Sequence, residues 1–269
     1  DQWEFAPSWT LNAGARYDDH SKAGDKTTLS AGLNKKFDEN SHAYFNWGQV
    51  FKAPTLDDLY YYSPDPYYGY DMFGDPDLKP EKGDSWTLGY GTKIAEKTEV
   101  NINYFQSDIK DAIKWDTRTY PAYPKNLYKQ KKNGLELNVS HELNESWNIE
   151  ASYSYVRVRS NTNNGDGFVR DTDYIPNIYR AGVRYHNDFW NADLFLRAGS
   201  GASKDSYVDS SYVTLDAAVS YKATKDLSFY AKGYNLFNKA YAESAGVSGA
   251  SYKYPAQGRR FIIGAEYSF

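Results

Sequence analysis

Gly-Arg-Arg-Phe-Ile-Ile-Gly-Ala-Glu-Tyr-Ser-Phe, residues 258–269, alternates apolar and polar side chains along its length. One face of the strand it predicts carries Phe261, Ile263, Ala265, Tyr267 and Phe269, and the other face is mostly polar or small. In water, an apolar strand that ends on an aromatic residue invites edge-to-edge pairing. In a closed membrane barrel every strand is paired and lipid covers the apolar face. The stretch therefore predicts an all-β transmembrane barrel, with these five residues as its membrane-insertion signal.

The composition agrees with a barrel that alternates lipid-facing and lumen-facing residues. The mean hydropathy is −0.77, and the sequence has no run of about 18 apolar residues, which excludes a transmembrane helix. Aromatic residues make up 17% of the chain, as expected for two aromatic girdles. The sequence has no Cys, in keeping with an exported protein without disulfides. The net charge of −4 is spread over mixed charges, so no nucleic-acid partner is predicted.

The same alternation recurs along the chain and predicts about twelve antiparallel strands, each of roughly ten residues. A soluble solenoid or a pair of sandwiches is the alternative. A sandwich buries one face of each strand, whereas the apolar face here keeps aromatic residues near both of its ends. The predicted strands lie within residues 8–17, 29–37, 43–47, 86–90, 100–104, 135–139, 147–155, 179–186, 190–197, 213–222, 227–231 and 261–269.

The predicted connections alternate between short and long. The short set is 38–41, 95–98, 144–146, 187–188 and 224–226, and the long set is 52–83, 115–128, 160–173, 200–210 and 239–257, with 18–26 intermediate. Outer-membrane barrels have short periplasmic turns and long outer loops. This pattern puts the carboxyl end and the start of the first strand in the periplasm, and it predicts an even number of strands.

Four short motifs mark places where strands begin or end: Phe51-Lys52-Ala53-Pro54-Thr55, the run 74–81 (Gly-Asp-Pro-Asp-Leu-Lys-Pro-Glu), the run 235–241 (Asn-Leu-Phe-Asn-Lys-Ala-Tyr) and the run 255–260 (Pro-Ala-Gln-Gly-Arg-Arg). Proline stops ladder pairing where a chain leaves a sheet, so we interpret the motifs as mainly architectural. In order and spacing, the four motifs resemble the C-terminal barrel half of the TonB-dependent outer-membrane receptors, and the resemblance covers nearly the whole chain.

The resemblance implies a 22-stranded barrel filled by an N-terminal plug. About twelve strands and no plug are predicted here, so residues 1–269 are interpreted as a single, incomplete domain. The implied partners are an N-terminal barrel and plug portion, TonB acting through that plug, and the lipid of the outer membrane of a diderm bacterium. Whether the other portion belongs to the same chain, a cleavage product or a separate subunit stays open. The implied activity is TonB-dependent active uptake.

The longest loop is unusually rich in tyrosine. Tyrosine offers a flat apolar ring and a phenol at low entropic cost, which suits a bulky, partly aromatic ligand. The alternative is a girdle residue where a strand leaves the membrane. The candidate ligand-binding residues of the outer loops are Tyr60, Tyr61, Tyr62, Tyr67, Tyr68, Tyr70, Trp115, Arg118, Tyr120, Tyr207 and Tyr252.

The family imports iron–siderophores, cobalamin, haem and some sugars. The haem receptors of the family are expected to place a His between the two proline-containing motifs. No His lies between Pro54 and Asp75, so haem is disfavoured. The tight spacing of the motifs and the short outer loops resemble those of the cobalamin receptors. In those receptors a Tyr in the loop after the strand at 178–186 is expected to contact the ligand, and Tyr207 fits this position. A basic residue just before the same strand is also expected to contact the ligand in cobalamin receptors, but Pro176-Asn177 stands at that place. Cobalamin and an iron–siderophore therefore stay equal candidates.

No resident cofactor or metal is predicted. A Ca²⁺ site is the less favoured interpretation of the loop carboxylates, because Asp is also common in polar turns. These carboxylates are Asp57, Asp58, Asp71, Asp75 and Asp77.

Two other functions compete with uptake. A passive pore would line a wet channel with Arg16, Arg180, Arg184, Asp193, Arg197, Asp216, Lys222 and Glu266. A barrel enzyme would use Asp18-Asp19-His20 at the outer rim to activate water. No Ser nucleophile is placed near a His, and the other three histidines lie near the periplasmic ends, so the prediction is that the protein is not an enzyme.

Overall fold

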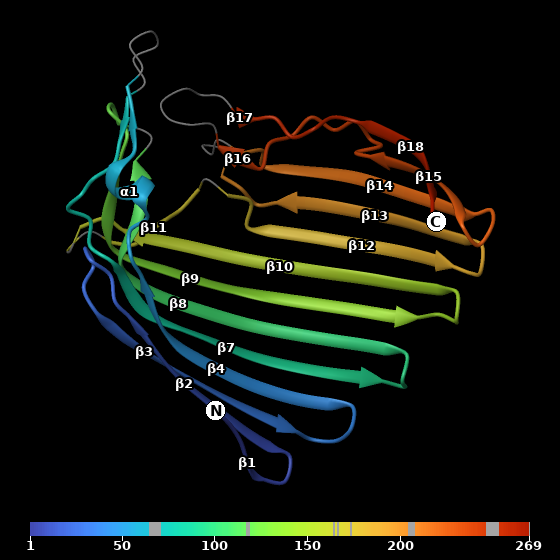
Figure 1. The fold of residues 1–269 in the computed structure, drawn as a ribbon, viewed down its shortest axis with the longest axis horizontal. Coiled ribbons are helices and arrows are strands. Elements are labelled where there is room, and N and C mark those ends of the chain that lie inside the picture. Colours follow the sequence, from blue (N-terminus) through green and yellow to red (C-terminus); the bar gives the residue numbers. More distant parts are fainter. Residues whose placement is uncertain are drawn as a thin grey trace.

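The computed structural model describes residues 1–64, 71–116, 119–163, 165, 167–172, 174–203, 208–245 and 253–268. Within these ranges, one antiparallel 14-stranded sheet dominates (Figure 1). A single short helix, α1 (Leu56–Tyr60), is described. No described helix is long and apolar enough to cross a membrane.

The strands pair mostly with their neighbours in sequence, as a meander. The order across the sheet is β1 (Gln2–Ala6), β2 (Trp9–Asp18), β3 (Lys26–Lys36), β4 (Ser41–Lys52), β7 (Glu81–Ile94), β8 (Thr98–Asp116), β9 (Tyr123–Glu142), β10 (Trp147–Asn161), β12 (Asn177–His186), β13 (Trp190–Ser200), β14 (Ser211–Lys222), β15 (Leu227–Tyr234) and β18 (Arg260–Tyr267), and β11 (Val169–Arg170) pairs with β10. Two small hairpins, β5 (Tyr62–Ser63) with β6 (Met72–Phe73) and β16 (Ser244–Ala245) with β17 (Lys253–Tyr254), lie off the main sheet.

The terminal stretch is a strand with its apolar face outward, as predicted. Phe261, Ile263 and Tyr267 are 65%, 83% and 59% exposed, and Ala265 is exposed beside them. Phe269 lies outside the described residues. The same pattern holds across the sheet, so one face presents a continuous apolar surface, which suits lipid rather than water.

Aromatic rings gather at two levels of this outward face. On β10, Trp147 packs on Tyr185 near the short turns (ring centroids 4.8 Å apart), and Tyr153 packs on Tyr179 further along (5.0 Å). At about 3.3 Å per residue, the six residues between these levels span about 20 Å of strand. Other pairs near the short turns are Phe5–Trp9, Phe37–Tyr90 and Trp190–Tyr221, and other pairs at the upper level are Phe45–Trp86 and Trp86–Tyr104.

The two-length pattern of connections is confirmed, with two corrections. An additional strand, β1, precedes the first predicted one and joins β2 through the turn at residues 7–8. The first strand therefore does not start at the short-turn end. The predicted loop 115–128 shrinks to 117–122, because β8 and β9 continue pairing as far as Asp116 and Tyr123.

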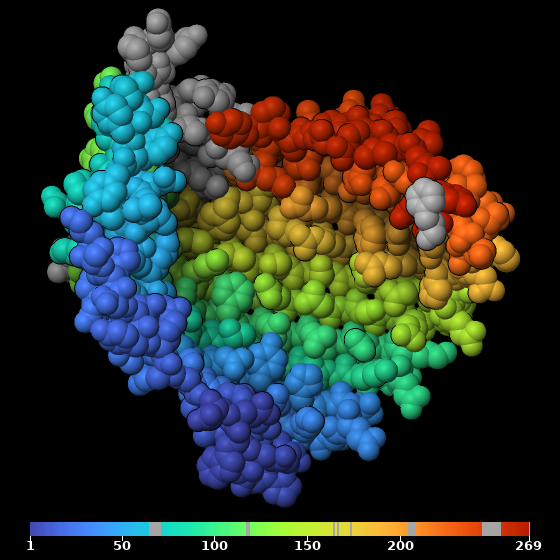
Figure 2. All heavy atoms as spheres, viewed as in Figure 1, coloured from blue at the N-terminus to red at the C-terminus, as the bar shows by residue number. Residues whose placement is uncertain are grey.

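The sheet is curved and open. Among the described residues, β1 pairs only with β2, and β18 pairs only with β15, so each presents one unpaired edge. Figure 1 shows these two strands at opposite edges of the sheet. In the space-filling view of Figure 2, the strands between them form successive coloured bands from blue to red.

Candidate functional site

The tyrosine-rich loop is built on a capped helical turn. The Thr55 side chain accepts a hydrogen bond from the Asp58 amide, and the Asp58 carboxylate accepts one from the Thr55 amide at 3.0 Å. This reciprocal capping box satisfies donors that the start of a helix leaves free. It fixes α1 immediately after Pro54, where β4 has ended.

The carboxylate of Asp58 also holds the loop against the neighbouring β8–β9 hairpin. Trp115 Nε1 donates to Asp58 Oδ1 at 3.0 Å, and the Trp115 ring meets Tyr61 edge-on at 5.8 Å between centroids. Burial of Asp58 opposes its ionisation, but the hydrogen bonds from Thr55 and Trp115 outweigh this, so the pKa of Asp58 lies below its usual value. Asp58 is therefore a charged structural anchor for the loop.

The predicted ligand residues that are described gather at the long-loop end. Tyr60, Tyr61 and Tyr62 follow one another along the loop and are exposed, and Tyr62 packs on Phe73 at 5.5 Å. The Tyr120 hydroxyl donates to Asp71 at 2.8 Å, which joins this loop to the tip of the β8–β9 hairpin. Trp115 is half-buried and acts as a support. Tyr67, Tyr68, Tyr70, Arg118, Tyr207 and Tyr252 lie outside the described residues.

The carboxylate of Asp75 serves local structure. Asp75 Oδ1 accepts from the Asp77 amide at 2.9 Å, closing a turn. Among the described residues, no group of three or more His, Asp or Glu side chains could hold a metal ion. At the same long-loop end of the sheet, where β2 connects to β3, Asp18 pairs with Arg16 at 2.8 Å, and His20 Nδ1 accepts from the amides of Lys22 and Ala23.

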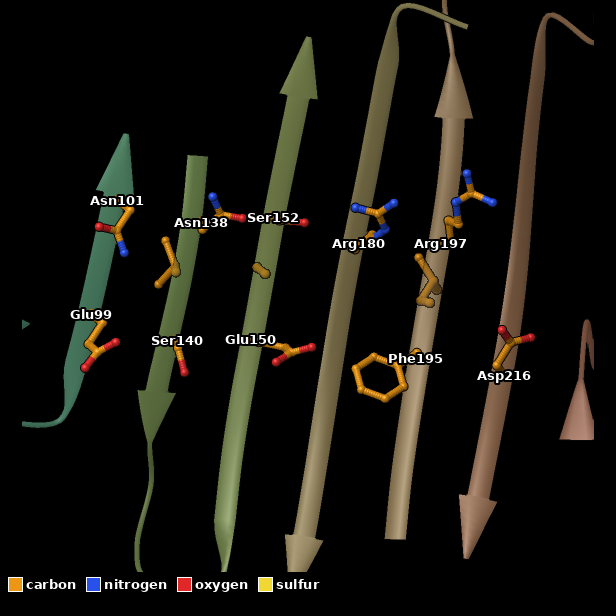
Figure 3. Close-up of a pocket in the computed structure, with 13 residues that line it drawn as sticks. Glu99, Asn101, Asn138, Ser140, Glu150, Ser152, Arg180, Phe195, Arg197 and Asp216 are labelled. Carbon is orange, nitrogen blue, oxygen red and sulfur yellow. The ribbon is translucent and has the colours of Figure 1, made fainter. Parts of the chain in front are cut away.

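The polar face of the sheet carries a hollow of about 470 Å³ across β8 to β14 (Figure 3). Figure 3 shows Arg180, Arg197 and Asp216 projecting from neighbouring strands on this face, with Glu150 and Phe195 beside them. By strand alternation, all eight predicted lumen residues lie on this face, and the register places Arg180 directly opposite Arg197.

Several of these charges are already paired. Arg184 contacts Glu150 at 3.3 Å and Asp193 at 3.8 Å. Arg197 forms a two-pronged pair with Glu243, at 3.0 Å and 2.7 Å, and the Tyr212 hydroxyl donates to the same carboxylate. Arg180 is exposed and forms no ion pair with a described residue, so it leaves a positive charge facing the hollow.

The motif at 235–241 is architectural, as predicted. Asn235 is 5% exposed, has a left-handed backbone (φ 47°), and donates from its side chain to Lys239 O at 2.9 Å and Gln257 O at 3.1 Å. Its amide donates to Asp216 at 2.7 Å. Asn126 plays a similar part for the motif at 74–81, since it accepts from the Lys79 amide and donates to Lys79 O. Sequence reasoning missed Asn126 and Glu243, and no local pattern marks either one.

Comparisons with known proteins agree with this architecture. The sequence profile described as "TonB dependent receptor-like, beta-barrel" matches residues 1–236. An iron-regulated outer membrane virulence protein of Vibrio cholerae is 24% identical over all of this chain and 43% of its own length. The vitamin B12 transporter BtuB of Vibrio vulnificus is 27% identical over 97% of this chain and 40% of its own length.

Solved structures show the same fold. The copper transporter OprC superposes with a TM-score of 0.79 at 19% identity, covering 100% of this chain and 46% of its own. The siderophore receptor PirA of Pseudomonas aeruginosa gives a TM-score of 0.75 at 19% identity, covering 100% and 47%. The chain spans less than half the length of the curated relatives it matches. From the profile match and the fold together, this chain belongs to the β-barrel of the TonB-dependent receptor family, whose members lie in the outer membrane of Gram-negative bacteria.

Proposed function

We propose that this chain is the C-terminal barrel portion of an outer-membrane receptor that takes up a scarce metal chelate, either cobalamin or an iron–siderophore, by TonB-dependent transport. The observation that carries the proposal is the exposed tyrosine cluster Tyr60–Tyr62, held by Asp58 and Trp115 at the long-loop end of a family barrel. Rigidly supported aromatic side chains bind bulky ligands at low entropic cost.

The open sheet supports a second portion of the same receptor as partner. An N-terminal portion would supply the strands that pair with β1 and β18 and a plug that occupies the polar face. Arg180, which faces the hollow without a described acidic partner, offers that plug a hydrogen-bonding cation. TonB would act through the plug, and this chain would supply the wall and the outer loops.

The two candidate cargoes share the chemistry that an exposed tyrosine surface would recognise. A corrinoid with its benzimidazole base and a catechol-type iron chelate are both large, rigid and partly aromatic. The relatives' names include a vitamin B12 transporter and an iron-regulated protein. Neither name selects one cargo for this chain, so the test must offer both.

The test uses the complete receptor in cells that lack their own receptors for the two cargoes. We expect energy-dependent uptake of radiolabelled cobalamin or of an iron–siderophore, abolished by a protonophore and by loss of TonB. Tyr60→Ala and Tyr62→Ala should each weaken ligand binding about tenfold, a value typical of exposed aromatic anchors. The matched control is Tyr17→Ala, since Tyr17 is similarly exposed (63%) but lies on the lipid-facing side of β2.

Uptake that persists without TonB and is indifferent to both tyrosine variants would refute the proposal and favour a passive pore. Conductance of the barrel without a plug would point to the same alternative.

A further inference from the structure

The outward face of the sheet changes from apolar to charged residues just above its upper level of aromatic rings. In register across neighbouring strands, Trp86 of β7 lies opposite Gln106 of β8, which lies opposite Asn133 of β9. Two residues further toward the long loops, Asp108 lies opposite Lys131, and Lys131 lies opposite Arg159. Apolar wall therefore gives way to charged wall within a few residues.

The next level is a row of three lysines. Lys82 of β7 lies directly opposite Lys110 of β8, and Lys110 lies directly opposite Lys129 of β9. By strand alternation all three side chains share the outward face with Trp86 and Tyr104. Like charges placed directly opposite in a sheet destabilise it, so the row is electrostatically unfavourable in isolation.

The carboxylates nearby do not balance this row. Asp108 is shared between Lys129 at 3.0 Å and Lys131 at 3.7 Å. Within the described part of the chain, Lys82 and Lys110 form no ion pair. Asp84 lies opposite Asp108 one level below. Counting Arg157, Arg159 and Arg170 on the same wall, seven cations face two carboxylates.

The arginines extend the basic surface sideways. Arg159 lies opposite Arg170 of β11, and Arg159 Nε is buried without a hydrogen-bond partner. Lys131 lies over the Phe168 ring at 5.0 Å, which fixes its ammonium group on the wall. The row and its flank, Lys82, Lys110, Lys129, Lys131 and Arg159, form what we call the basic collar.

The height of the collar identifies its partner. Lys82 lies four residues from Trp86 on the same strand face, about 13 Å of strand and roughly 10 Å of height for a strand tilted by about 40°. Headgroups occupy the layer immediately above the hydrocarbon core. Lysine stems reach several ångströms along an apolar surface toward such a layer.

We propose that the basic collar binds the phosphate groups of a lipid in the outer leaflet, whose acyl chains lie on the apolar wall below. Three ammonium groups in one row match a multiply charged phosphate headgroup, and Arg159 adds positive charge beside them. The inference rests on the outer-membrane placement given under the proposed function. It concerns the outer wall, so it is separate from ligand binding at the loops.

The test measures lipid retention by the complete receptor. The delipidated receptor in detergent is titrated with bisphosphorylated lipid A and, in a parallel arm, with the same lipid after enzymatic dephosphorylation, and binding is followed by native mass spectrometry. Each basic residue near an anionic headgroup is worth about a fivefold change in affinity. The triple variant Lys82→Gln, Lys110→Gln, Lys129→Gln should therefore bind the bisphosphorylated lipid on the order of 100-fold more weakly.

Two matched variants keep the result interpretable. Lys36→Gln, Lys97→Gln and Lys225→Gln remove three exposed lysines near the short turns and should leave lipid affinity unchanged. Replacing the row with three arginines should retain binding, because it keeps the charge. Uptake of the metal chelate should persist in the glutamine triple variant, so a failure of the proposed function would show separately in the wild type.

Equal lipid retention by the wild type and the glutamine triple variant would overturn the inference. So would equal affinity for the dephosphorylated lipid. Binding of free tripolyphosphate as tightly as the lipid would also overturn it, because the partner would then be a soluble polyanion.

Discussion

Replacing Asp58 with alanine removes the carboxylate that joins the tyrosine loop to the β8–β9 hairpin. Three donors lose their acceptor: the Thr55 amide at 3.0 Å, the Thr55 hydroxyl at 2.7 Å and Trp115 Nε1 at 3.0 Å. Asp58 is only 7% exposed, so water replaces these bonds incompletely. The loop should detach while the sheet stays folded.

The size of the effect follows from the bonds that are lost. A hydrogen bond to a charged acceptor contributes about 1.5–3 kcal/mol net. Thr55 lies at the exposed start of α1 and regains water, so we count the Trp115 bond fully and the two Thr55 bonds in part. The expected loss is about 3 kcal/mol in the free energy of local opening, which raises amide exchange on the order of 100-fold.

The assay is hydrogen exchange of the complete receptor in micelles, read on peptides covering residues 55–64. Asp57→Ala is the matched control, since Asp57 is an exposed aspartate in the same turn and its side chain accepts no hydrogen bond from a described residue. Peptides from β9 and β10 should exchange as in the wild type, because local opening leaves the ladder intact. Indistinguishable exchange in the Asp58 and Asp57 variants would refute the anchoring role.

Three further outcomes are expected. Because the pKa of Asp58 is lowered in the folded protein, its contribution is complete above the unfolded value of about 4 and is lost as the pH falls through the folded value; exchange of residues 55–64, corrected for intrinsic rates, should rise below pH 4 in the wild type but not in Asp58→Asn. Ile263→Lys puts a charge on the lipid-facing side of β18 and should cost about 2–4 kcal/mol of barrel stability, whereas Ile262→Lys on the opposite face should cost less; equal urea midpoints for the two variants in vesicles would contradict this assignment of faces. Gly74→Ala would bring a Cβ within 2.6 Å of the α1 backbone at Leu59 and Tyr60, so it should destabilise the loop by about 1–3 kcal/mol, visible as faster proteolysis there, and unchanged cleavage would show that the contact is loose.

Strand positions could be predicted wherever one face meets lipid and the other meets the lumen, because only there does the sequence alternate. The stretch 147–155 in β10 shows this clearly. The upper part of β9 was not predicted as strand: Lys125 fell in the predicted loop 115–128, and Lys129, Lys131 and Lys132 fell before the predicted strand 135–139. Both faces are wet above the membrane, so the alternation disappears there. β1 was missed because Trp3 and Phe5 alone are too short a pattern.

The candidate site was predictable in composition but not in construction. The tyrosines stand out in the sequence, whereas their supports are single polar residues. Thr55-Leu-Asp-Asp58 has the capping-box pattern, so Asp58 could have been recognised as a cap. The bond from Trp115, 57 residues away, depends on strand register and has no local signal. Arg197 and Glu243 are likewise 46 residues apart.

The unpaired backbone groups at the two edges of the sheet determine whether the open sheet is stable in a membrane. In an antiparallel ladder, half the backbone groups of an edge strand point away from its partner, so eight-residue β18 presents roughly four N–H and four C=O groups along its free side. Each unsatisfied group in hydrocarbon costs several kcal/mol. The sum is some tens of kcal/mol and exceeds the 5–15 kcal/mol net stability of a typical domain. An open sheet of this kind therefore does not persist in lipid.

Either β1 and β18 meet, which requires the sheet to close far more tightly than the curvature in Figure 1, or further strands complete the wall. Relatives more than twice as long as the matched region favour further strands.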